Sequence, residues 1–84
     1  MGIKRRPKPR KLAKKLALIR KHLDISQSEM VRLLRLKKPY DRSTISAYER
    51  GEREPPLPIL LKYARLVGIS TDILIDDKFD LPRQ

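Results

Sequence analysis

Apolar residues recur at helical spacing in several short stretches, and residues that start or stop a helix bound these stretches. The first set, Leu12, Leu16, Ile19 and Leu23, has spacings of four, three and four positions and therefore shares one helix face. Lys15 falls outside this face, so we expect its ammonium group to be in water. No segment alternates convincingly between apolar and polar residues as a half-buried strand does. The pattern predicts an all-α protein.

Capping signals mark the next two helices. Ser26, followed three positions later by Glu29, forms a capping box that satisfies free amides at a helix start. Asp41 is a good N-cap for a third helix that runs from residue 42 to about 50. Gly51 stands where a left-handed C-terminal cap is expected. These signals place two short helices next to each other in the chain.

Two further helices are predicted after a proline-rich loop. Pro58 suits the first turn of a fourth helix, which we expect Gly68 to end. The core face of that helix is expected to comprise Leu57, Leu60, Leu61, Ala64 and Val67. Ser70 is expected to cap a short fifth helix. The chain thus divides into a flexible basic arm (1–10), a helical domain (11–75) and a C-terminal tail (76–84), in which nothing is expected to bury the paired carboxylates of Asp76 and Asp77.

The charge balance indicates a polyanionic partner (nucleic acid, an anionic membrane surface or an acidic protein) or a reason to tolerate self-repulsion. Lys and Arg number 21 against 10 Asp and Glu, a formal net charge of +11. There is no cysteine and one histidine, His22, which we interpret as solvated, so neither a metal site nor a cofactor is expected. Without a nucleophilic cysteine or a glycine-rich phosphate loop, an enzyme is not expected either. No apolar run has the length of a membrane span, and we expect a cytoplasmic, nucleoid-associated protein of bacterial type.

The third helix has a face suited to nucleic acid. With Ile45 taken as the inward residue, Tyr48 and Glu49 fall near the same side. The opposite side carries small side chains flanked by two arginines: Arg42, Ser43, Ser46, Ala47 and Arg50. Small side chains let a helix enter the DNA major groove, and arginines reach guanine edges or phosphates. This face predicts a helix that reads base edges, whereas an ordinary solvated helix more often carries Glu and Lys there.

Two stretches resemble one family. SQSEMVRLL (26–34) followed by RSTISAYERGEREPPLPILLKYARLVGISTDILI (42–75) is similar to the Cro-repressor, or XRE-type, helix-turn-helix family. The resemblance covers about residues 12–75 and implies a five-helix, lambda-repressor-like DNA-binding domain. It implies that Gln27 touches a DNA phosphate, that Arg42, Ser43 and Ala47 face bases, and that Thr44 and Arg50 lie near the backbone. It also implies that Arg20 pairs with Glu49, while we expect Tyr48 in the core.

The turn between the second and third helices is about four residues longer than is usual in the family. It contains Lys37, Lys38 and Tyr40, which we expect beside the sugar-phosphate backbone because the turn adjoins the groove-facing end of the third helix. A solvated loop with a proline stop is the alternative.

The basic arm is the other electrostatic element. Its charged residues, Lys4, Arg5, Arg6, Lys8 and Arg10, resemble arms that follow the minor groove or the backbone, and a solubilising tail is the alternative.

Together these features predict sequence-specific binding of double-stranded DNA through a recognition helix at about 42–50. The chain is then a transcriptional regulator or an engineered DNA binder on that scaffold. The alternative is a protein-interaction or antitoxin-like adaptor whose DNA binding is secondary. We expect no membrane and no small-molecule substrate as partner. With no long heptad run to form a dimer, we expect a monomer in solution that dimerises on DNA if at all.

Overall fold

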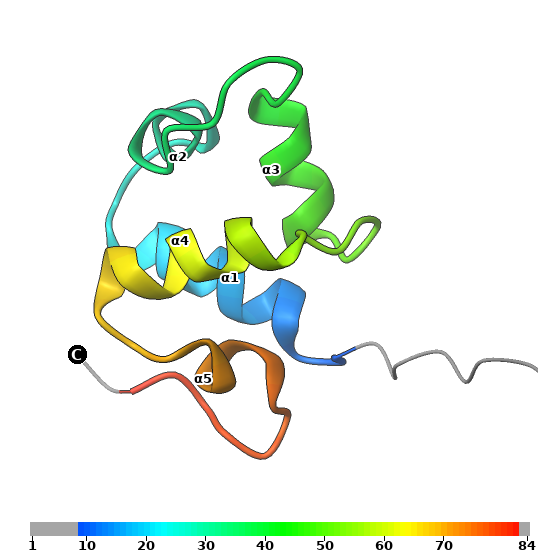
Figure 1. Ribbon diagram of the computed structural model, residues 1–84, viewed down its shortest axis with the longest axis vertical. Coiled ribbons are helices and arrows are strands. Elements are labelled where there is room, and N and C mark those ends of the chain that lie inside the picture. Colours follow the sequence, from blue (N-terminus) through cyan, green and yellow to red (C-terminus); the bar gives the residue numbers. More distant parts are fainter. Residues whose placement is uncertain (1–8, 83–84) are drawn as a thin grey trace, which may run out of the picture.

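The computed structural model describes residues 9–82, which form five helices and no strand (Figure 1). The helices are α1 (Leu12–His22), α2 (Gln27–Leu33), α3 (Arg42–Glu49), α4 (Leu57–Val67) and α5 (Thr71–Ile75). The expected all-α, five-helix architecture is confirmed. Within residues 9–82, none of the helices is long and apolar enough to cross a membrane.

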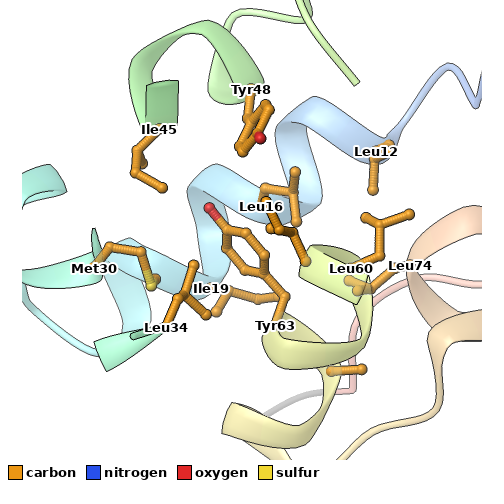
Figure 2. Packing of buried hydrophobic residues seen from close by; sticks show 12 residues of the cluster. Leu12, Leu16, Ile19, Met30, Leu34, Ile45, Tyr48, Leu60, Tyr63 and Leu74 are labelled. Atoms are coloured by element: carbon orange, nitrogen blue, oxygen red, sulfur yellow. The ribbon is translucent and has the colours of Figure 1, made fainter. Parts of the chain in front are cut away.

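Every helix contributes to one core, and α1 supplies its centre. α1 packs against both α3 and α5, α2 packs against α3, and α4 packs against α5. Figure 2 shows apolar side chains from all five helices converging on Leu16 of α1 and Tyr63 of α4. The largest fully buried side chains are Leu16, Met30, Ile45, Leu60, Tyr63 and Leu74. Because α3 rests on this core through α1 and α2, its orientation is set by the interior of the domain.

The caps of α2 and α3 form as the sequence predicts. The Ser26 hydroxyl accepts from the Glu29 amide (3.0 Å), and the Glu29 carboxylate accepts from the Ser26 amide (3.3 Å). The Asp41 carboxylate accepts from the Ser43 amide (2.9 Å), and the Thr44 hydroxyl accepts from the Asp41 amide (3.1 Å). Hydrogen bonds from the Ser43 hydroxyl and amide hold the pKa of Asp41 below its usual value. In both helices, side chains therefore satisfy part of the free amides at the start.

The C-terminal end of α3 is closed by a glycine turn. Gly51 has a φ of +74°, which is a left-handed conformation that glycine adopts at little cost. Its amide donates to the Tyr48 carbonyl (3.2 Å), and the Glu52 amide donates to the Ala47 carbonyl (3.0 Å). This pair of bonds is a Schellman motif, and it folds the chain back against the last turn of α3.

The predicted core face of α4 is partly wrong. Leu57 and Leu61 are 62% and 39% exposed, whereas Ile59 and Tyr63, which the prediction left out, are buried with Leu60 and Ala64. The helix is rotated relative to the expected face, so that the large ring of Tyr63 points into the core. An aromatic ring buries more apolar area than a leucine at the same place would, which favours this rotation.

The expectation that Lys15 lies in water is also wrong, because its side chain is only 3% exposed. Its ammonium group donates to the carbonyls of Ile73 (2.7 Å) and Asp76 (3.0 Å) at the end of α5. Terminal carbonyls of a helix have no partner within the helix and attract cations. Desolvation by burial lowers the pKa of Lys15, and the neighbouring carboxylates, Asp77 first, oppose this shift.

The segment after α5 packs back onto α1. The Asp77 carboxylate accepts from the amides of Arg10 and Lys11, each at 3.0 Å, and so caps α1, whose own N-cap residue makes no side-chain cap bond. These hydrogen bonds hold the pKa of Asp77 below its usual value. Leu81 packs against the core. We call the contacts of Lys15 and Asp77 across α1 and α5 the C-terminal clasp. They correct the expectation for the tail, because Asp77 is half-buried and hydrogen-bonded to the start of α1.

Candidate nucleic-acid interface

α2 and α3 lie at one end of the domain, and α5 lies at the other (Figure 1). The loop that joins α2 to α3 arches over this end and leads directly into the capped first turn of α3. The two helices pack against each other, which leaves the outer side of α3 facing away from the core.

The outer side of α3 is narrower than the sequence predicts. Arg42, Ser43 and Arg50 are exposed and Ser46 is half-buried. Ala47, which was expected on this face, is only 7% exposed, because the chain after Gly51 folds over the last turn of the helix. The buried inner side consists of Thr44, Ile45, Ala47 and Tyr48. Tyr48 thus lies in the core as expected, and burial raises its pKa.

Thr44 is committed to its cap. Thr44 is only 5% exposed, and its hydroxyl already accepts a hydrogen bond from the Asp41 amide.

An ion pair fixes α3 to α1, as the resemblance implies. The Arg20 guanidinium donates to both oxygens of the Glu49 carboxylate, from Nε at 2.7 Å and from Nη2 at 3.0 Å. The Gln27 amide nitrogen also donates to this carboxylate, at 3.3 Å. The hydrogen bond with Glu49 raises the pKa of Arg20. One carboxylate therefore joins α1, α2 and α3 and positions Gln27 at the start of α2.

The long α2–α3 turn presents its two lysines outward. Lys37 and Lys38 are exposed, whereas Tyr40 is half-buried and packs against the core. The lysines lie just before the N-terminal end of α3, which carries Arg42.

A second carboxylate near α3 was missed by the sequence analysis. Arg50 donates to the Glu52 carboxylate from Nε (2.8 Å) and Nη2 (3.0 Å), and to the Ser46 hydroxyl from Nη1 (2.7 Å). The signal for this pair is a glycine between the two charged residues, because a left-handed turn at that glycine brings their side chains together.

The root of the basic arm emerges beside α3. Pro9 and Arg10 line an open groove together with Arg53 and Pro55 from the loop after α3. The arm residues expected to contact DNA, Lys4, Arg5 and Arg6, lie outside the described residues. Within the described part of the chain, no three His, Cys, Asp or Glu side chains come together in a way that could hold a metal ion.

Two consecutive helices, the second one capped and outwardly exposed, are the arrangement of helix-turn-helix proteins. The family model described as a helix-turn-helix domain matches residues 13–78, and the chain belongs to this family. The fold is similar to that of the P22 c2 repressor protein, solved in complex with synthetic operator 9T. The TM-score is 0.67, and the sequence identity is 26% over 79% of this chain and 94% of the repressor chain. These findings confirm the resemblance to the Cro-repressor type of helix-turn-helix domain and the lambda-repressor-like fold. Among curated proteins, none matched this chain.

Proposed function

We propose that this chain binds double-stranded DNA sequence-specifically and regulates transcription, with α3 in the major groove. The observation that carries this proposal is the exposed side of α3, which presents arginines and small polar groups and is held rigidly by the Arg20–Glu49 pair. Membership of the helix-turn-helix family and the similarity to a repressor solved on its operator support it. A formal net charge of +11 favours attraction to the phosphate backbone.

We expect the outer side of α3 to contact the base edges. Arg42 extends from the first turn and suits the acceptor pair of a guanine. The Ser43 hydroxyl donates to Asp41 and so suits a donor on a base edge, whereas the Ser46 hydroxyl accepts from Arg50 and can donate to an acceptor. Ala47 is only 7% exposed, so its role is to pack beneath this face, and the proposed base contacts come from Arg42, Ser43 and Ser46.

Backbone contacts surround this face and supply affinity without sequence information. Gln27 approaches a phosphate from the start of α2, and the long turn adds Lys37, Lys38 and Tyr40. Thr44, whose hydroxyl is used by the cap, serves to fix the first turn of α3 from which Arg42 extends. Lys4, Arg5 and Arg6 of the arm would add contacts along the backbone or in the minor groove.

The test is selection of bound duplexes from a random DNA library at near-physiological salt, followed by affinity measurements on the selected duplex. We expect a motif of several base pairs. Arg42→Ala should weaken binding to that duplex by about 1–3 kcal/mol and relax the preference at one base pair. Arg65→Ala is the matched control, because Arg65 is exposed on α4 and its loss changes the charge equally.

Selection without a motif, or equal losses in both variants, would refute sequence reading by α3. A palindromic motif would indicate that two copies bind together. The adaptor alternative has one observation in its favour, the exposed leucines Leu57 and Leu61 on α4. It would gain weight if Arg42→Ala changed no measured interaction while substitutions on α4 did.

A further inference from the structure

Glu52 lies beside Arg50 because the chain reverses at Gly51. The left-handed φ of Gly51 (+74°) turns the backbone, and the bond from the Glu52 amide to the Ala47 carbonyl (3.0 Å) fixes residue 52 below the last turn of α3. The Glu52 carboxylate thereby comes within 2.8 Å of Arg50 Nε. The position of this carboxylate is a consequence of the helix cap.

The contacts of Arg50 hold its side chain along the outer side of α3. Its Nε and Nη2 donate to the two oxygens of Glu52, and its Nη1 donates to the Ser46 hydroxyl. Three of the five N–H groups of the guanidinium are therefore engaged within the protein. The Ser46 hydroxyl, having accepted from Arg50, keeps its own hydrogen for an acceptor.

The Arg50–Glu52 pair does not join two helices, as the Arg20–Glu49 pair does. The side chains of Arg50 and Glu52 are 57% and 60% exposed, and an ion pair so exposed adds little to folding stability. The side chains of Arg20 and Glu49, at 17% and 7%, are mostly buried between helices. The Arg50–Glu52 pair lies instead on the side of α3 that we propose faces DNA.

We propose that Glu52 limits the affinity for DNA by acting through Arg50, a role that rests on the proposed DNA binding. By pairing with Arg50, it withholds a cation from the phosphate backbone, which carries one charge per about 1.7 Å of duplex. Binding to any sequence is weakened, whereas base reading by Arg42 and Ser43 is left intact. Because this loss is the same for every duplex, Glu52 lowers the specific and the non-specific affinity by the same factor and leaves their ratio unchanged.

The test is Glu52→Gln in the full chain, with affinities measured for the selected duplex and for a scrambled duplex over a series of salt concentrations. Freed from its partner, Arg50 gains a phosphate contact. The slope of log affinity against log salt should steepen by about 0.9, and affinity for the scrambled duplex should rise about five-fold at 0.15 M salt. The ratio of specific to non-specific affinity should stay the same, because the added contact does not depend on sequence and raises both affinities by the same factor.

Two controls separate this role from a general effect of charge. Asp72→Asn removes an equal charge at an exposed position of α5, at the end of the domain opposite α3, and should change the slope much less (Figure 1). In an Arg50→Gln background, Glu52→Gln should add no further change in slope.

The proposal is overturned if Glu52→Gln behaves like Asp72→Asn, or if its effect persists without Arg50. If the unmodified chain does not distinguish the selected from the scrambled duplex, the proposed function fails instead. The slope comparison needs only non-specific binding and still decides the role of Glu52.

Discussion

At the scale of single residues, buried polar groups decide how α3 is held. Glu49 receives hydrogen bonds from Arg20 and Gln27, so its charge is compensated where it leaves water. Such a pair orients helices, and its net effect on stability is small because desolvation offsets the attraction. Removal of either partner would leave a buried charge without compensation, which is the costly change.

Tyr63, unlike Glu49, carries a buried polar group without a hydrogen-bond partner in residues 9–82. Its ring is fully buried, and among the described residues its hydroxyl has no hydrogen-bond partner. Desolvation by burial raises its pKa well above the usual value. Tyr63→Phe keeps the ring and removes the unsatisfied group, so we expect the free energy of unfolding to increase by about 1–3 kcal/mol. Urea denaturation measures this change.

Tyr40→Phe is the control, since Tyr40 is only half-buried and its substitution should change stability by less than about 0.5 kcal/mol. A loss of stability in Tyr63→Phe would show that this hydroxyl is bonded in solution, for example to a trapped water.

At the scale of elements, α3 depends on its ends. A helix of eight residues is not stable alone in water, so its caps and its packing against α1 and α2 must hold it. The Asp41 cap fixes the first turn, which carries Arg42 and Ser43. The Gly51 turn fixes the last turn and with it the position of Glu52.

Gly51→Ala tests the C-terminal turn. The added Cβ would lie 3.6 Å from the Ala13 Cβ, which is ordinary contact, so the cost arises from the positive φ and should be about 1–2 kcal/mol of unfolding free energy. Thermal and urea denaturation measure it.

Gly68→Ala is a matched comparison, because Gly68 has a φ of +71° and nothing within 4 Å of the added Cβ. Both variants should lose similar stability. Only Gly51→Ala should also alter the salt dependence of DNA binding, because only that turn places Glu52. An unchanged stability in Gly51→Ala would contradict the left-handed turn.

At the scale of the whole molecule, the C-terminal clasp joins the two ends of the described chain. Lys15 closes the end of α5, and Asp77 closes the start of α1, so each helix is capped by a side chain distant in sequence. The clasp also fixes Arg10, the last residue of the basic arm.

The clasp predicts a dependence of stability on pH. The pKa of Asp77 is lowered in the folded chain, chiefly by the hydrogen bond from the Arg10 amide. Its contribution to stability is therefore fully present above the unfolded pKa of about 3.9 and is lost as the pH falls through the lower folded pKa. Asp77→Asn should lower the Tm at neutral pH, and the difference from the unmodified chain should shrink toward zero in acid. Scanning calorimetry across this range measures it, and a difference that stays constant into acid would contradict the role of the carboxylate.

The sequence by itself determined the features whose partners are close in the chain. Ser26 and Glu29, Asp41 and Thr44, and Gly51 with the last turn of α3 all satisfy one another within a few positions. Such hydrogen bonds depend on local backbone geometry alone, so helix starts and stops could be predicted. The outer side of α3 followed from helical periodicity, and the Arg20–Glu49 pair followed from the family resemblance.

Only the tertiary structure decided what depends on packing between distant segments. Lys15 and Ile73 are 58 positions apart, and Arg10 and Asp77 are 67 positions apart. Helical periodicity places Lys15 outside the apolar face, but it does not show that the open carbonyl end of another helix lies there. The rotation of α4 and the covering of Ala47 likewise arise when helices and loops compete for one core. These choices depend on how apolar burial and polar pairing balance over the whole domain, which no short segment of sequence specifies.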